Sequence, residues 1–265
     1  MDVNYIWREE STPEADRFPF VGVALHDGHY LRDDVAELMI LPEADRLREE
    51  DPFTSEWTSI APTRIVALAS RFQVDLNRPR ATAVYRTPED AWGLSMWRDQ
   101  LPQEVIDRSL QQYDDFYEAM ERILRGAAER YGRFVVFDLH SYGHRRDGPD
   151  GPHADVDGNP QVNVGTGTMD RARWAPVVDR FINDLRAYPF PTGTLDVREN
   201  VKFIGRRFPE WTHQTFPESA CVLALEFKKF FMDEWTGEPD RHLIEEIKKA
   251  LDSTLPGLQE ELERA

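Results

Sequence analysis

The segment RFVVFDLHSYGH, residues 133–144, determines the fold that the sequence predicts. Its apolar run, residues 134–137, is typical of a buried central strand, because both faces of such a strand must be covered. Polar residues follow at once, among them Asp138 and His140. In open α/β sheets ligands bind beyond the carboxyl ends of the strands, so we expect the functional site here. The alternative is that Asp138 and His140 form only a hydrogen-bonded pair at the strand end, since histidine alone is not diagnostic.

A second apolar run, residues 20–25, is also followed by a histidine, His26. Gly28 comes two residues later and allows a tight turn of the backbone. Because the carboxyl ends of neighbouring parallel strands meet at one edge of a sheet, we expect the imidazoles of His26 and His140 to lie close together. His29 either joins them or faces solvent from the turn.

The third apolar run, residues 221–227, carries Glu226 near its end. Burying an unpaired carboxylate is costly, so we expect Glu226 to bind a metal, to pair with a cation or to act in catalysis. A cluster of three carboxylates, Glu49-Glu50-Asp51, follows a predicted helix. Such a cluster is as often a solvated helix end as part of a site.

The remaining pattern predicts a layered α/β fold, because long helices alternate with apolar strands. We expect helices, from the spacing of apolar residues, over residues 42–48, 101–131, 174–188 and 242–251. We expect further short strands over residues 72–76, 162–166 and 201–204. Residues 1–19 are expected to form an N-terminal arm or edge strand, and residues 141–166 an active-site loop, within one domain spanning residues 1–265. Loops of this length in compact domains are often functional.

Three arginines, Arg71, Arg78 and Arg80, lie close together in a chain that is otherwise acidic. The planar guanidinium group is suited to binding a carboxylate, so the cluster indicates an anionic small-molecule substrate. The alternative is an internal network of salt bridges with some of the many carboxylates.

Composition excludes several classes of protein. The chain has 265 residues, 40% of them hydrophobic, and a formal net charge of −17, which disfavours nucleic acid as a partner. It has no N-terminal apolar segment typical of an export signal and no run of 18 apolar residues, so we expect a cytoplasmic protein that does not span a membrane. The single cysteine, Cys221, excludes an internal disulfide and a cysteine-based metal cluster.

The pattern is typical of a mononuclear zinc hydrolase. It consists of two histidines at strand ends, an acidic cluster between them in the sequence, and a glutamate on a strand near the C-terminus. Two imidazoles and one carboxylate leave the fourth zinc position for water, whose pKa the metal lowers to about 7. A separate glutamate then acts as general base on that water and returns the proton to the leaving amine.

These motifs resemble the carboxypeptidase-like zinc hydrolases and, more closely, the N-formylglutamate amidohydrolase family. The motifs are LHDG (residues 25–28), REED (48–51), SRFQVDLNRP (70–79), DLHS (138–141), and ALE (224–226) with FMDE (231–234). The resemblance extends from about Val21 to Glu234, and DLNRP is its most specific part. It implies a three-layer α/β/α fold with a mixed, mainly parallel central sheet, as in zinc carboxypeptidases and the phosphorylase/hydrolase-like folds.

The resemblance also implies one zinc ion per chain. His26 and His140 would be two of its ligands, and the third would be either Glu50 or Asp51. The family's first motif is commonly PHSG, where this chain has LHDG, and the segment 141–166 does not match the family well.

The same resemblance implies roles for residues around the ion. Asn77 and Arg78 would hold the substrate carboxylate, Glu226 would be the general base, and Arg71 and Arg80 would add positive potential. We therefore expect hydrolysis of the amide bond of a small anionic N-acyl amino acid such as N-formylglutamate. The alternatives are a carboxypeptidase-like peptidase, which needs an open groove, and a non-catalytic member of the fold that binds an acidic metabolite.

Overall fold

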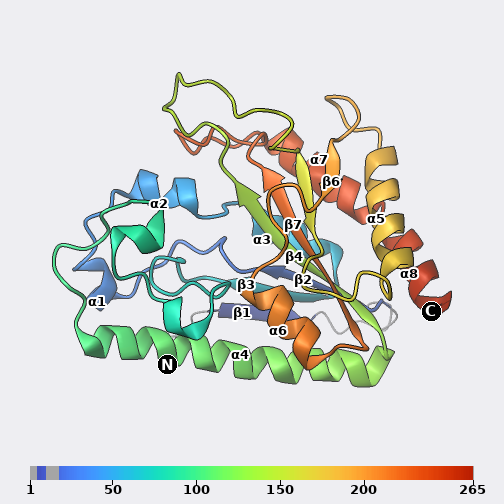
Figure 1. Ribbon diagram of the computed structural model, residues 1–265, viewed down its shortest axis with the longest axis horizontal. Helices are drawn as coiled ribbons and strands as arrows, with labels where there is room; N and C mark the ends of the chain where they lie inside the picture. Colours follow the sequence, from blue (N-terminus) through green and yellow to red (C-terminus); the bar gives the residue numbers. More distant parts are fainter. Residues whose placement is uncertain (1–4, 10–17, 265) are drawn as a thin grey trace.

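The central strand of the sheet is β4, Phe134–Tyr142, which is buried along its whole length. The computed structural model describes residues 5–9 and 18–264 of the chain. In it β4 lies between β2, Phe20–Ala24, and β7, Ala220–Lys228, and runs parallel to both. The three apolar runs of the sequence therefore form the centre of the sheet, and their carboxyl ends meet at one edge (Figure 1).

The sheet has seven strands in the order β1-β3-β2-β4-β7-β5-β6. The outer strands are β1 (Tyr5–Glu9), β3 (Thr63–Ala67), β5 (Val162–Gly165) and β6 (Val197–Glu199). The β1–β3 and β5–β7 pairs are antiparallel and the other neighbouring strands are parallel. This confirms the predicted α/β fold with a mixed, mainly parallel sheet. β1 is the edge strand expected in the N-terminal arm; residues 1–4 and 10–17 of that arm lie outside the described residues.

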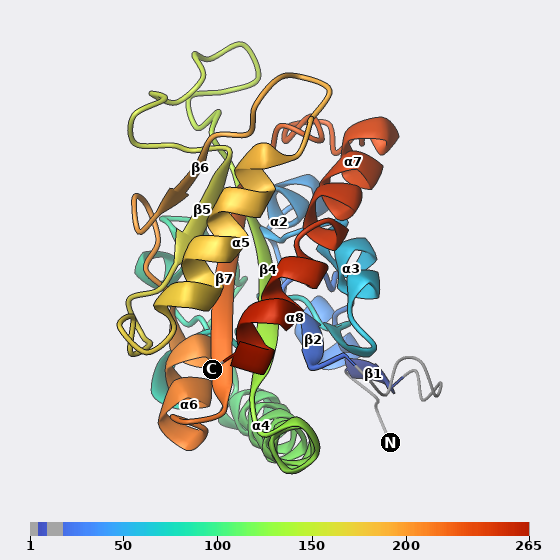
Figure 2. The ribbon, with the colours of Figure 1, turned by 90° about the vertical axis from the view of Figure 1, so that its right-hand side faces the viewer.

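Helices cover both faces of the sheet (Figures 1 and 2). One face packs against α3 (Thr54–Trp57), α5 (Ala175–Ala187), α7 (Arg241–Asp252) and α8 (Leu255–Arg264). The other face packs against α4 (Gln103–Tyr131) and α6 (Arg207–Thr215). Two short helices, α1 (Asp33–Ala36) and α2 (Glu43–Glu49), lie in the connection between β2 and β3. The three-layer arrangement follows because each face of an apolar sheet must be covered.

The alternation of side chains along β4 decides on which face the site is built. Val135, Phe137 and Leu139 point into the core under α5 and α7. Phe134 and Val136 point into the core on the α4 side. Because the side-chain period of a strand is two, Asp138 and His140 continue the second series and face the α4 side, beyond its apolar core.

Two predicted strands are wrong. Residues 72–76 form turns and irregular backbone instead. The backbone N–H groups of Gln73 and Val74 donate to the carbonyl of Ser70, and the carbonyl of Leu76 accepts from the Tyr117 hydroxyl on α4. Residues 201–204 are also irregular, and the side chain of Asn163 binds both backbone groups of Phe203. The alternating apolar residues at 72–76 reflect burial beside α4, since Val74 and Leu76 belong to its core.

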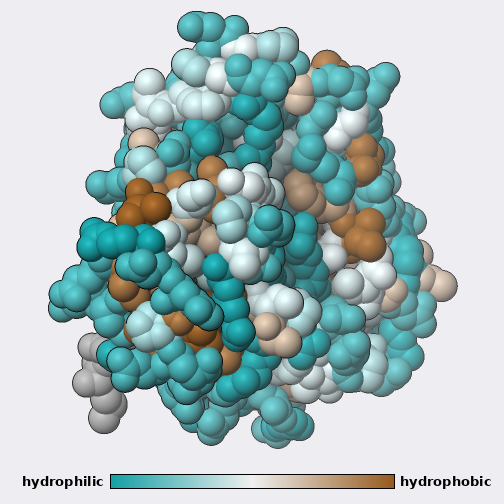
Figure 3. Space-filling model, turned by 60° about the vertical axis from the view of Figure 1, so that its left-hand side comes forward, coloured by the Kyte–Doolittle hydropathy of each residue, from teal (hydrophilic) through white to brown (hydrophobic). Residues whose placement is uncertain are grey.

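The expected helices all form, and α8 follows the helix that the sequence predicted to close the chain. The loop between β4 and β5 is residues 143–161, which is shorter than the predicted 141–166 because both strands extend into that range. Figure 3 shows a face of the molecule on which hydrophilic residues predominate and hydrophobic ones form small separate groups. Within residues 5–9 and 18–264, every helix is too short or too polar to span a bilayer.

Candidate metal centre

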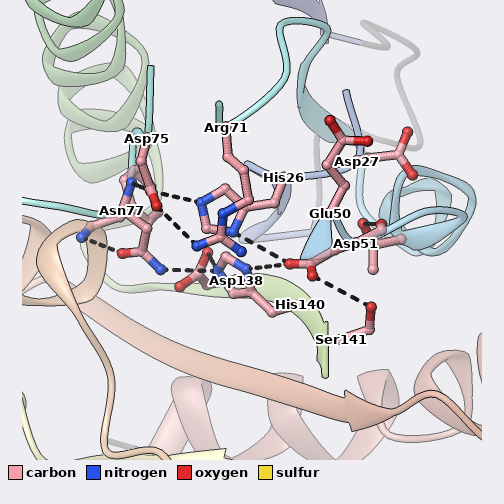
Figure 4. A network of polar contacts seen from close by, with 12 residues as sticks. His26, Asp27, Glu50, Asp51, Arg71, Asp75, Asn77, Asp138, His140 and Ser141 are labelled. Atoms are coloured by element: carbon pink, nitrogen blue, oxygen red, sulfur yellow. Dashed lines mark hydrogen bonds and ion pairs between the residues drawn. The ribbon is translucent and has the colours of Figure 1, made fainter. Parts of the chain in front are cut away.

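Three predicted ligands, His26, Asp51 and His140, lie together at the carboxyl edge of the sheet (Figure 4). His26 follows β2 and His140 lies on β4, and their ring centroids are 4.9 Å apart. Asp51 follows α2, and one potential ligand atom from each residue lies within 4.8 Å of the others. All three side chains are buried. Together they could hold a metal ion.

A single oxygen of Asp51 lies between the two imidazoles. Its Oδ2 is 3.3 Å from His26 Nδ1 and 3.0 Å from His140 Nδ1. Burial acts to raise the pKa of Asp51, but the interactions with His140 and His26 outweigh it and hold that pKa well below its ordinary value. The carboxylate is therefore ionised and available as a ligand.

A second carboxylate lies behind each imidazole. Asp75 Oδ1 is 2.8 Å from His26 Nε2, and Asp138 Oδ1 is 3.0 Å from His140 Nε2. A carboxylate at Nε2 favours a proton on that nitrogen, so Nδ1, the nitrogen that faces Asp51, is the one that a metal ion would use. Metal-binding histidines are usually oriented in this way.

The tautomer of His140 is assigned from its partners. Asn77 Nδ2 lies 3.2 Å from His140 Nε2, and the orientation of this amide is fixed because Asn77 Oδ1 accepts the backbone N–H of Phe208 at 2.9 Å. Asn77 Nδ2 and His140 Nε2 both carry hydrogen if Nε2 is protonated, and two donors cannot form a hydrogen bond with each other. The hydrogen bond from Nε2–H to the charged carboxylate of Asp138 is the stronger one, so we place the proton on Nε2.

The carboxylate of Glu50, the other predicted candidate for third ligand, points away from the cluster. It accepts hydrogen bonds from the Ser70 hydroxyl and from His29 Nδ1. This pairing with Glu50 raises the pKa of His29. Consecutive residues of extended backbone point to opposite sides, so the chain can bring only one of Glu50 and Asp51 to the histidines. That residue is Asp51.

Glu226 lies beside the cluster on β7, directly opposite His140 in the parallel register. Its side chain faces the same side of the sheet as His140. Loss of hydration, together with the negative charges of Asp51 and Asp138, raises the pKa of Glu226 to about 8 even though His140 acts to lower it. A carboxylate with such a pKa can exchange protons near neutral pH.

The cluster lines a small cavity of about 80 Å³ that also contains Glu226, Asn77 and Arg78. Arg78 is stacked over the Tyr85 ring at 4.5 Å, and its Nε is 3.6 Å from Asp75, beyond hydrogen-bond distance. Its guanidinium is therefore held at the wall of the cavity by the face of an aromatic ring and by the charge of Asp75.

The other two predicted arginines have different positions. Arg71 lines the cavity, but it donates to the Tyr85 hydroxyl at 3.3 Å, to the Glu49 carbonyl at 3.1 Å and to Asp75 at 2.9 Å. It therefore holds Asp75 in place behind His26. Arg80 is exposed and forms a bidentate salt bridge with Asp114 on α4, so it does not lie in the cavity.

The model of the N-formylglutamate amidohydrolase family matches residues 18–231, which include all of these cavity residues. The chain belongs to this family. It is therefore a member of a hydrolase family, as the motifs indicated. No curated protein matches the sequence.

Solved structures share the fold of this family member. An N-formylglutamate amidohydrolase from Ralstonia eutropha JMP134 superposes with a TM-score of 0.73 at 18% identity, over 98% of each chain. Gene product Atu2144 from Agrobacterium tumefaciens superposes with a TM-score of 0.58 at 14% identity, over 96% of each chain. At these identities the likeness shows the fold alone.

Two further residues of this amidohydrolase-family site were not singled out in the sequence. Asp75 lies in the DLNRP motif, two residues before Asn77. Its closeness in sequence to the predicted site residues Asn77 and Arg78 is the feature by which it could have been found. Lys229 lines the cavity and is fully buried. The sequence gives no sign of this burial, because two adjacent lysines are ordinarily expected at the surface.

A larger open depression of about 980 Å³ lies next to the cavity and shares Lys229 with it, but it lacks the ligand cluster.

Proposed function

We propose that this protein is a zinc-dependent hydrolase that cleaves the amide bond of a small anionic N-acyl amino acid, such as N-formylglutamate. One observation carries the proposal: two imidazoles direct Nδ1 at one carboxylate oxygen, and each imidazole has a second carboxylate behind it. Without an ion, each imidazole lies between two carboxylates, which favour a proton on both of its nitrogens. A cation that replaced the two Nδ1 protons would be held by both imidazoles and by Asp51.

The three side chains fit a zinc ion. Zinc prefers imidazole nitrogen and carboxylate oxygen, and ligand atoms around one tetrahedral ion with bonds of about 2.0–2.2 Å lie roughly 3.3 Å apart. The separations from Asp51 Oδ2 to the two Nδ1 atoms are 3.0 and 3.3 Å. Three protein ligands leave a fourth position open, as in catalytic zinc sites. When bound, the ion supplies Lewis acidity that polarises an amide carbonyl and makes water more acidic.

Glu226 is the candidate proton carrier. In the metal-free site its pKa is about 8. Positive charge at the nearby cluster lowers this pKa, so Glu226 becomes ionised and can accept a proton from water. The same side chain then donates the proton to the leaving nitrogen, which is released as an amine.

Arg78 and Asn77 are the candidate substrate-binding residues. The guanidinium of Arg78 presents paired donors to a carboxylate, and its stacking on Tyr85 fixes the plane of these donors. Holding the substrate carboxylate at this point orients the amide bond toward Glu226. The small volume of the cavity favours a small substrate over a peptide chain.

The first test is the metal content of protein purified without chelator or nickel affinity, measured by elemental analysis. We expect about one zinc per chain in the wild type and in His242→Ala, which removes an exposed histidine from α7. His140→Ala should lose the metal. No metal in the wild type, even after zinc is added, would contradict the proposal and would favour a non-catalytic binding protein. With zinc present, release of free amine from a panel of N-formyl and N-acetyl amino acids tests the substrate class.

A further inference from the structure

We infer that Lys229 is a positioning residue that holds Asp51 at the metal centre through the backbone. The inference rests on the proposed metal site and concerns a residue that is not itself a candidate ligand. Lys229 is only 1% exposed, and it follows the end of β7. A fully buried ammonium group needs compensation, because removing its charge from water is costly.

The compensation comes from two carbonyl groups. Lys229 Nζ donates to the carbonyl oxygens of Arg48 and Glu50, both at 2.6 Å. Arg48 lies in the last turn of α2, and Glu50 is the residue that caps this helix. The last carbonyls of a helix have no partner within the helix, and a cation there also complements the helix dipole. Lys229 therefore fixes the end of α2.

The contact with Glu50 bears directly on Asp51. The carbonyl of Glu50 and the N–H of Asp51 belong to one planar peptide group. Lys229 binds the oxygen of that group, and its N–H donates to the carbonyl of His26 at 2.9 Å. The peptide is thus held from both sides, and its rotation is prevented. Because the N–H of Asp51 belongs to this peptide, the two contacts also fix the backbone position from which the Asp51 side chain reaches the imidazoles.

The charge of Lys229 also suits this position. Burial lowers the pKa of its ammonium group, whereas the nearby carboxylates of Asp51, Glu49 and Glu234 favour the charged form. An apolar side chain would avoid the cost of burial, but it would leave two carbonyl oxygens without a donor. The lysine is therefore explained by the backbone that it holds.

The test compares zinc affinity in the full-length protein by competition with a chromophoric chelator. Lys229→Met should bind zinc about 10–100-fold more weakly than the wild type, the usual cost of losing a residue that supports a metal ligand. Lys228→Met is the matched control, because Lys228 Nζ donates to the carbonyl of Asn159 at 3.0 Å and does not contact residues 48–51. Its affinity should stay within about twofold of the wild type.

The outcomes separate this inference from the proposed function. If the wild type binds no zinc, the proposed function fails. If the wild type binds zinc and Lys229→Met binds it equally well, the inference alone fails. A crystal structure of metal-free Lys229→Met should show the Glu50–Asp51 peptide rotated, and an unmoved peptide would overturn the inference. Should that variant not fold, Lys229→Gln keeps an N–H donor group without the charge, and its zinc affinity should fall between those of the wild type and His140→Ala.

Discussion

Glu226→Gln should stabilise the metal-free protein while it abolishes turnover. Loss of hydration and the neighbouring carboxylates raise the pKa of Glu226 from 4.5 to about 8. In the window between these values the folded state keeps a proton that the unfolded state has lost, so the free energy of unfolding falls as the pH rises. Glutamine imitates the protonated form and avoids this loss.

The magnitude follows from the width of that window. Each pH unit above 4.5 costs about 1.4 kcal/mol, so at pH 7 the variant should be more stable than the wild type by ~3 kcal/mol. At pH 4.5 the two proteins should be equally stable. For a chain of this size the difference at pH 7 corresponds to roughly 6–12 °C in Tm.

Urea unfolding of the metal-free protein at pH 4.5, 6 and 7.5 measures this effect. Glu245→Gln, a change at an exposed position of α7, is the control and should show no gain at any of these pH values. In the zinc-loaded protein, Glu226→Gln should lower kcat by about 10²–10⁴-fold, the contribution of a general base. A stability gain that does not depend on pH would refute the assignment of the raised pKa, and full activity would remove Glu226 from catalysis.

Three further predictions test the site and its surroundings. Asp138→Asn should weaken zinc binding about 10-fold or more in a chelator competition, because the charge behind one ligand is lost. Arg78→Ala should raise KM about 10–100-fold with zinc content unchanged, whereas Arg80→Ala should leave KM within about twofold; equal effects would contradict the placement of these arginines. Burial lowers the pKa of His213 from 6.5 to about 4, so the protein should lose ~3 kcal/mol of stability as the pH falls through this range. In urea unfolding, His213→Gln should remove this acid sensitivity and His242→Gln should not.

The centre of the fold could be predicted because its strands are apolar on both faces. The runs at 20–25, 134–137 and 221–227 have no polar face, so only a position between covered neighbours suits them. His26 and His140 follow or end two of these runs, so they could be predicted to lie at one edge of the sheet, where the structure brings them together.

The choice between Glu50 and Asp51 could not be made from the sequence. Both residues are carboxylates, and both are fully buried in the structure. The choice depends on the position of the backbone at Glu50 and Asp51, which Lys229 and the carbonyl of His26 hold from distant parts of the chain. Arg80 could not be distinguished from Arg78 for a similar reason, since its partner, Asp114, lies on a helix that begins 23 residues later.

The two histidines of the site have carboxylate partners with different surroundings. Asp75 is bound by the side chains of Arg71 and Tyr85 and by the backbone N–H of Asn77, so much of its charge is neutralised. The Oδ2 atom of Asp138 has no hydrogen-bond partner among the described residues. The charge of Asp138 therefore acts mainly on His140. Burial acts to lower the pKa of that imidazole, but Asp138, Asp51 and Glu226 together outweigh it and raise that pKa. Since an imidazole beside an unshielded carboxylate attracts a cation more strongly, His140 should contribute more to metal affinity than His26.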